Sequence, residues 1–214
     1  MLKGIAIGTM TVDHVGAILF PDIAFLRMIG RLAFPIFLYL MLLGIESTRN
    51  TKSYFMRLLI FALISQTPYF LAFAIKPYEQ LNIFFTLLFG GLSVYLFHKG
   101  NLLGLLPVLA AVFLNAEAGL YGIVFVACIS LLKKNTALGV LASFLLNSPF
   151  LFEWDIQALS LLSLIVIVLH KQGCFRIERE TAERAAYFTW MKYAFYVYYP
   201  LHLTFLYSVK LYLL

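Results

Sequence analysis

The sequence predicts an all-α fold, a polytopic membrane helix bundle of about nine transmembrane helices with its N-terminus in the cytoplasm. Three observations lead to this class. Of the 214 residues, 63% are hydrophobic and only 12% are charged, whereas a soluble domain carries about 25% charged residues. Apolar runs such as LLGLLPVLAAVFL are continuous and lack the alternation of membrane strands. Lys and Arg residues also gather in alternate connectors, as expected when successive helices cross a bilayer.

Nine apolar segments are candidates for membrane-spanning helices, which need about 17–25 residues for a full crossing. In chain order they run over 4–20, 31–47, 55–75, 81–98, 102–116, 119–132, 136–151, 156–170 and 187–210. The fifth to seventh are short, and they are compatible with tilted or re-entrant helices. Pro35 is expected to kink the second segment. No linker or repeat divides the chain, so residues 1–214 are expected to form a single domain.

The sidedness of the bundle follows from its positive charges, because cytoplasmic connectors carry an excess of Lys and Arg. Lys192 lies inside the last segment. If the chain crosses nine times, and Lys192 is left aside, the side opposite the N-terminus carries only four Lys and Arg residues: Arg27, Arg31, Lys76 and Lys210. The N-terminus is therefore expected in the cytoplasm. The net charge of +6 is explained by topology and contact with anionic lipid, so no nucleic-acid partner is expected.

Asp13 and His14 are adjacent polar residues inside the first apolar segment. An ionised side chain in hydrocarbon costs about 3 kcal/mol on insertion scales, so such residues are candidates for function. His202 lies in the outer half of the last segment, at the depth expected for His14, and the two histidines are expected to meet. The alternative is that each is a core histidine bonded to a neighbouring helix. Adjacent helical positions point about 100° apart, so Asp13 is expected to meet another helix, through Arg27 or Arg31.

Other polar residues have weaker signals. Gln66 and Asn82 lie at the ends of facing segments and are expected to form hydrogen bonds between helices. Cys128 and Cys174 are expected at different depths, so neither a disulfide nor a metal site is predicted. Arg31 is a candidate for steadying an oxyanion or a substrate, although an arginine at a membrane rim is often only an anchor.

Lys3 and His14 are eleven residues apart in one predicted helix. Eleven residues make almost three turns, so the two side chains project from nearly the same face, about 16 Å apart along the axis. This spacing places a cation at the cytoplasmic rim in line with a buried imidazole. A phosphorylated carrier anchored at Lys3 would reach His14 with a thin arm. The alternative is that Lys3 only sets topology.

The segments MTVDHVGAILFP, GRLAFPIFLYLMLLGIESTRNTKSYFMRLLIFALISQTPYFLAF, LNIFFTLLFG and FYVYYPLHLTFLY together resemble the TraX family. The resemblance covers most of residues 3–98 and again 187–207, while 99–186 match in hydrophobic character only. The namesake of the family N-acetylates the N-terminus of F-type pilin. The family is similar to a wider group of integral-membrane acyltransferases, which includes O-antigen acetylases and the lysosomal heparan N-acetyltransferase.

The resemblance implies a bundle of nine or ten helices in the bacterial cytoplasmic membrane, with acetyl-CoA supplied from the cytoplasm. In many of the wider group an Arg, ten residues and a His mark the first helix, and Lys3 and His14 occupy these positions here. His14 is then the implied catalytic base or acyl carrier. Lys3, with Arg49 and Lys52 on the same predicted side, is a candidate for holding acetyl-CoA.

The function expected from these observations is acetyl transfer from acetyl-CoA to an amine or hydroxyl on the outer side of the membrane, with His14, Asp13, Arg31 and His202 as the catalytic candidates. The acceptor would be a pilin-like N-terminus or an envelope glycan. A rival is a small transporter in which Asp13, His14 and His202 relay protons, although the inverted repeats common in transporters are absent from the sequence. A non-catalytic pilus-assembly protein is the third possibility.

Overall fold

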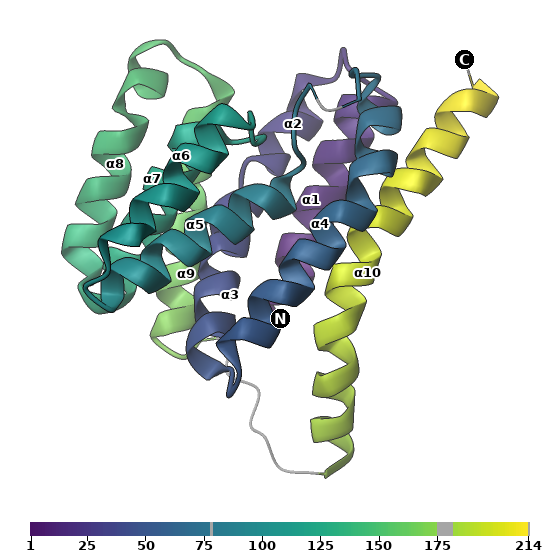
Figure 1. Ribbon diagram of the computed structural model, residues 1–214. Helices are drawn as coiled ribbons and strands as arrows, with labels where there is room; N and C mark the ends of the chain where they lie inside the picture. The colour runs from purple at the N-terminus through teal and green to yellow at the C-terminus, as the bar shows by residue number, and fades with distance from the viewer. Residues whose placement is uncertain (78, 175–181, 214) are drawn as a thin grey trace.

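The computed structural model is an α-helical bundle and describes residues 1–77, 79–174 and 182–213 (Figure 1). The described residues contain no strand, which confirms the all-α class. In chain order the helices are α1 (Leu2–Ile18), α2 (Ala24–Gly30), α3 (Ala33–Ser47), α4 (Thr51–Phe73), α5 (Ile83–His98), the 3₁₀ turn η1 (Leu102–Gly104), α6 (Leu105–Phe113), α7 (Gly119–Lys134), α8 (Thr136–Phe152), the 3₁₀ helix η2 (Ile156–Leu161), α9 (Leu162–Lys171) and α10 (Ala182–Leu213).

Each of the nine apolar segments contains a helix, but the helices differ in length. Within the described residues, Ala24–Ser47 and Thr51–Phe73 are long and apolar enough to cross a membrane. The helices at Ile83–His98, Leu102–Phe113, Thr136–Phe152 and Ile156–Lys171 are apolar and shorter. These properties are consistent with a membrane protein, while nine full crossings and a cytoplasmic N-terminus stay predictions.

Contacts between connectors group them at two ends of the bundle. At one end, the loop after α4 is bonded to the loop after α6, with Leu81 N donating to Asn115 O at 3.1 Å and Glu117 N donating to Leu81 O at 2.8 Å. At the other end, Lys171 Nζ donates to Leu132 O at 3.0 Å and bridges α9 to α7. These bonds join connectors and helix ends that are far apart in the chain.

The core is centred on α3, which packs against α1, α5, α7 and α9. Ile36 and Leu38 on this helix are fully buried. By contrast, α6 and α8 present large apolar side chains outward, among them Phe113 and Phe144. Many exposed large apolar side chains on these helices are consistent with faces that lipid covers.

Pro35 lies beside an interruption at the start of the segment that it was predicted to kink. The proline lies in the first turn of α3, and the helix is interrupted just before it, at Arg31 and Leu32. A proline ring clashes with the carbonyl four residues earlier, which is that of Arg31. The interruption separates α2 from α3 and leaves Arg31 at the junction, beside the cavity described below.

Gln66 and Asn82 form the helix-to-helix bonds that the sequence predicted. Asn82 Nδ2 donates to Gln66 Oε1 and to Ala62 O, both at 2.8 Å. Asn82 Oδ1 accepts from Phe84 N at 3.1 Å and so caps α5. These bonds hold the loop that precedes α5 against α4, next to the cavity.

Candidate active site

A cavity of about 530 Å³ lies between α1, the α2–α3 junction, the loop before α7, and η2. Its polar lining comes from elements far apart in the chain: Asp13, His14, Arg31, Glu117, Tyr121, Asp155, Gln157 and Tyr199. This is the size range of small-molecule sites, and a few convergent polar groups in an otherwise apolar wall are typical of them.

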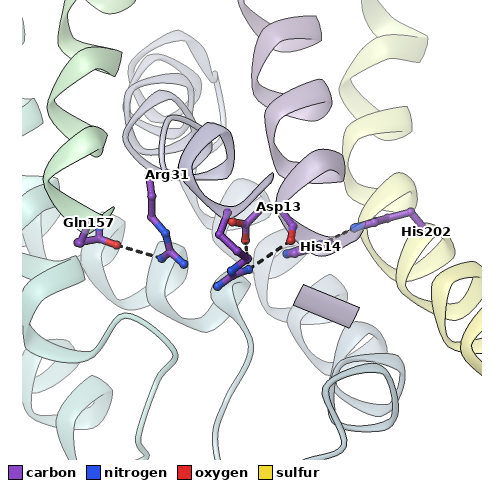
Figure 2. A network of polar contacts seen from close by, with 6 residues as sticks. Asp13, His14, Arg31, Gln157 and His202 are labelled. Atoms are coloured by element: carbon purple, nitrogen blue, oxygen red, sulfur yellow. Dashed lines mark hydrogen bonds and ion pairs between the residues drawn. The ribbon is translucent and has the colours of Figure 1, made fainter. Parts of the chain in front are cut away.

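His14 and His202 contact each other at the cavity. Both side chains are buried, with 7% exposure each, and His14 Nδ1 lies 2.6 Å from His202 Nε2. Figure 2 shows His202 reaching from α10 to His14 on α1. The predicted meeting of the two histidines is therefore present. Phe73 and Tyr199 pack edge-on against the His14 ring and hold its orientation.

A backbone contact determines which ring nitrogens of this pair carry hydrogen. His202 Nδ1 lies 2.9 Å from Tyr198 O, and a carbonyl can only accept, so Nδ1 carries the hydrogen. In the neutral ring Nε2 of His202 is then an acceptor, and Nδ1 of His14 must donate to it. His14 is left with its lone pair on Nε2. The arrangement orients His14 as a base or nucleophile, as a buried acceptor does in a catalytic triad.

Asp13 is paired with Arg27, one of the two partners predicted for it. Arg27 Nη1 donates to Asp13 Oδ2 at 2.6 Å and joins α2 to α1. Gly30 packs directly against the Asp13 carboxyl, where a Cβ would overlap it. Asp13 Oδ1 is buried and has no hydrogen-bond partner among the described residues.

Arg31 belongs to a second polar network on the opposite wall. Its Nη1 donates to Gln157 Oε1 at 3.0 Å (Figure 2). Gln157 Nε2 then donates to the Tyr121 hydroxyl at 3.0 Å, and this hydroxyl donates to Asn147 Oδ1 at 3.0 Å. The chain of bonds from η2 through α7 to α8 holds the guanidinium at the cavity.

Four buried polar atoms of the cavity lining lack a hydrogen-bond partner within the described part of the chain. They are Asp13 Oδ1, Arg31 Nε, Glu117 Oε2 and Tyr199 Oη. Buried polar atoms are nearly always satisfied, and each one left without a bond costs about 1–3 kcal/mol. Their convergence from four elements on one cavity indicates a site for a polar ligand.

Glu117 is a charged cavity residue that the sequence did not make conspicuous. It lies in the connector NAEAG, between two apolar segments, where a charged residue is ordinary. The only available signal was the position of that connector, on the same predicted side as the His14 end of the first helix. Burial, with the nearby Asp13 charge, raises the pKa of Glu117 from 4.5 to about 7. Gln157 and Tyr121 were likewise not singled out.

The raised pKa of Glu117 predicts a pH-dependent stability. The carboxyl binds its proton more tightly in the folded state, so its contribution is complete below pH 4.5 and is lost as the pH rises to about 7. Glu117→Gln should remove this dependence while leaving a fold stable at both extremes. Thermal unfolding in detergent between pH 4.5 and pH 8 measures it. An unchanged slope in the variant would contradict the assignment.

The residues predicted to hold acetyl-CoA lie away from the cavity lining. Lys3 is in the first turn of α1, on the same uninterrupted helix as His14, and the separation of about 16 Å is retained. Arg49 is exposed in the connector between α3 and α4, and Lys52 is exposed in the first turn of α4. A role in cofactor binding stays a prediction for all three. Arg176 and Arg179, counted among the cytoplasmic charges, lie outside the described residues.

Comparisons with known proteins agree with the resemblance. The probable fimbrial assembly protein FimC of serogroup H1 from Dichelobacter nodosus is 25% identical, over 99% of this chain and 95% of that protein. An uncharacterized protein, RP591, of Rickettsia prowazekii is 29% identical over 99 residues. These residues make up 46% of this chain and 37% of that protein. No solved structure matches the chain. The model of the TraX protein family matches residues 1–210, and the chain therefore belongs to the TraX family.

Proposed function

We propose that this protein is a multi-pass acetyltransferase of the bacterial inner membrane, with its N-terminus in the cytoplasm. It moves an acetyl group from cytoplasmic acetyl-CoA to an amine or hydroxyl of an acceptor on the outer side. The observation that carries this proposal is the buried His14–His202 pair, oriented by Tyr198 O, at the wall of a polar cavity. Membership of the TraX family and the fimbrial name of one relative support a pilin-like acceptor, and an envelope glycan is the alternative.

The chemistry follows from the protonation of the pair. His14 Nε2 takes the acceptor proton as the acceptor attacks the thioester carbonyl. The negative charge that develops on the carbonyl oxygen is stabilised by Arg31, whose Nε has no other partner among the described residues. Collapse of the intermediate breaks the carbon–sulfur bond, and the CoA thiolate receives the proton from His14. His202 keeps His14 in the required tautomer throughout.

Lys3 would bind the phosphates of CoA at the opposite end of α1, with Arg49 and Lys52 nearby on the same side. The pantetheine arm would then run along α1 toward His14. Asp13 holds Arg27 and shapes the cavity wall between the two reactants. With acetyl-CoA bound at Lys3 and the acceptor bound at the cavity, the acetyl donor would enter from the cytoplasmic side and the acceptor from the outer side, as the proposed reaction requires.

The proposal is tested by supplying labelled acetyl-CoA to membranes that contain the protein and following label into envelope protein and glycan. The purified protein should also be stabilised by CoA, by about 2.7 kcal/mol at a hundred times the Kd. ATP, which shares the nucleotide but lacks the pantetheine arm, is the control ligand. A proton-coupled transporter would show neither effect, and a protein with no transfer and no stabilisation by CoA would rule out the acetyltransferase.

A further inference from the structure

Glu117 is held at the cavity by the backbone on both sides of it. Its own N donates to Leu81 O at 2.8 Å, and Ala118 N donates to Thr86 Oγ1 at 3.4 Å. Asn115 adopts a left-handed backbone with φ of 47° and accepts from Leu81 N. Asparagine adopts the left-handed region more readily than other residues with a side chain, so the loop turns at Asn115 and brings Glu117 back against Leu81.

The carboxylate so positioned has an unused oxygen. Glu117 Oε2 is buried, lines the cavity with His14, and has no hydrogen-bond partner in the described ranges. A hydrogen bond from the Ile83 backbone holds the Glu117 carboxylate in place, and Oε2 is the oxygen that this bond leaves without a partner. A carboxylate whose free oxygen faces a cavity is available to a ligand.

The charged and titratable groups around Glu117 come from every element packed on this part of the cavity. Asp13 on α1 repels a negative charge there, while Arg27 and Arg31 on and after α2 attract it. The phenols of Tyr69 on α4 and Tyr199 on α10 complete the surroundings. Glu117 is therefore coupled electrostatically to both sides of the polar cluster.

When the acceptor is an ammonium group, the proton balance of the proposed reaction requires a second proton acceptor besides His14. A hydroxyl loses one proton on acetylation, and the departing CoA thiolate takes it through His14. An ammonium loses two protons, because it must first become a neutral amine before it can attack. The second proton has no place on His14, whose partner His202 is already an acceptor for the Nδ1 hydrogen.

We infer that Glu117 accepts the first proton of an ammonium acceptor, which leaves His14 free to take the second as the bond to the acetyl carbon forms. The step is balanced: R–NH₃⁺ and the Glu117 carboxylate become R–NH₂ and the carboxylic acid, and the acid releases its proton to solvent after product leaves. The inference rests on the proposed acetyl transfer. It assigns Glu117 a role with an ammonium acceptor that a hydroxyl acceptor does not require.

Two matched acceptors separate the role of Glu117 from the reaction itself. One is the peptide amide Ala-Gly-Gly-NH₂, and the other is its lactyl counterpart, in which a hydroxyl replaces the ammonium. The α-amino group has a pKa of about 8, so roughly a tenth of the alanyl peptide is neutral at pH 7. Glu117→Gln should slow transfer to the alanyl peptide about tenfold at pH 7. The loss should vanish by pH 9, and transfer to the lactyl peptide should be unchanged.

Glu79→Gln is the matched control, because Glu79 is an exposed carboxylate on the adjoining loop. Equal loss with both peptides, or no loss with either, would overturn the role of Glu117. Failure of the proposed function has a different signature, since the wild-type protein would then acetylate neither peptide. Infrared difference spectra give an answer that does not depend on turnover. The alanyl peptide alone should raise a protonated carboxyl band at pH 7 that Glu117→Gln lacks, and absence of that band would also overturn the inference.

Discussion

Replacing His14 with alanine is expected to lower acetyl transfer about 10²- to 10⁴-fold, the range in which a positioned general base contributes. His14 offers the cavity a nitrogen whose lone pair is set by its bond to His202. Without the ring, the acceptor must lose its proton to water. Rates with labelled acetyl-CoA in membranes measure the change, at matched protein levels and with folding checked by thermal unfolding.

His202→Phe separates orientation from chemistry. The variant keeps a ring against Tyr198 and Tyr199 but removes the acceptor for His14 Nδ1. The expected loss is in kcat, with little change in KM, because the pair sets the tautomer of the base and does not bind the acceptor. His98→Gln is the control, since this histidine lies at the end of α5, outside the cavity lining. Full activity of His14→Ala would refute the proposed mechanism.

Gly139→Ala is expected to be among the most destabilising single substitutions in the chain. The helices α7 and α8 are joined by Asn135 alone, and this short turn brings Gly139 against the backbone of Leu132. A Cβ there would overlap main-chain atoms, which cannot rotate away as a side chain would. Overpacking of this kind costs about 1–3 kcal/mol, and the rigid neighbour places Gly139→Ala at the upper end.

Gly4→Ala and Gly8→Ala on α1 are the matched controls, because a Cβ at either position meets nothing within 4 Å. Alanine in place of glycine inside a helix should instead add about 0.5–1 kcal/mol of stability. Thermal unfolding of the four proteins in the same detergent gives the comparison. A Gly139→Ala protein as stable as the wild type would show that α7 and α8 can separate without cost.

The candidate site was partly visible in the sequence because a polar residue inside an apolar run is costly in lipid. That cost made Asp13, His14 and His202 conspicuous, and charge segregation placed the two histidines at one depth. Glu117 and Gln157 were not conspicuous, since both lie in or beside connectors where polar residues cost nothing. The bonds from Leu81 to Asn115 and Glu117, and from Thr86 to Ala118, bring Glu117 to the cavity.

The choice between Arg27 and Arg31 as the partner of Asp13 was also beyond the sequence. A continuous helix would bring the two arginines, four residues apart, to the same face. In the structure Arg31 N still donates to Arg27 O at 3.2 Å, so the two residues follow one helical turn. Their side chains nevertheless have different partners, Gln157 for Arg31 and Asp13 for Arg27. Which arginine reaches Asp13 therefore depends on the neighbouring helices and not on the spacing along α2.

Composition and hydropathy were enough to determine an all-helical, membrane-like class and the order of the helices, because lipid and backbone hydrogen bonding leave few alternatives for such a chain. Tertiary structure decided which side chains share the cavity and which nitrogen of His14 carries the lone pair. The two histidines are 188 residues apart. Their contact depends on the rotation of α10 against α1, which many distributed packing contacts set and no local sequence pattern encodes.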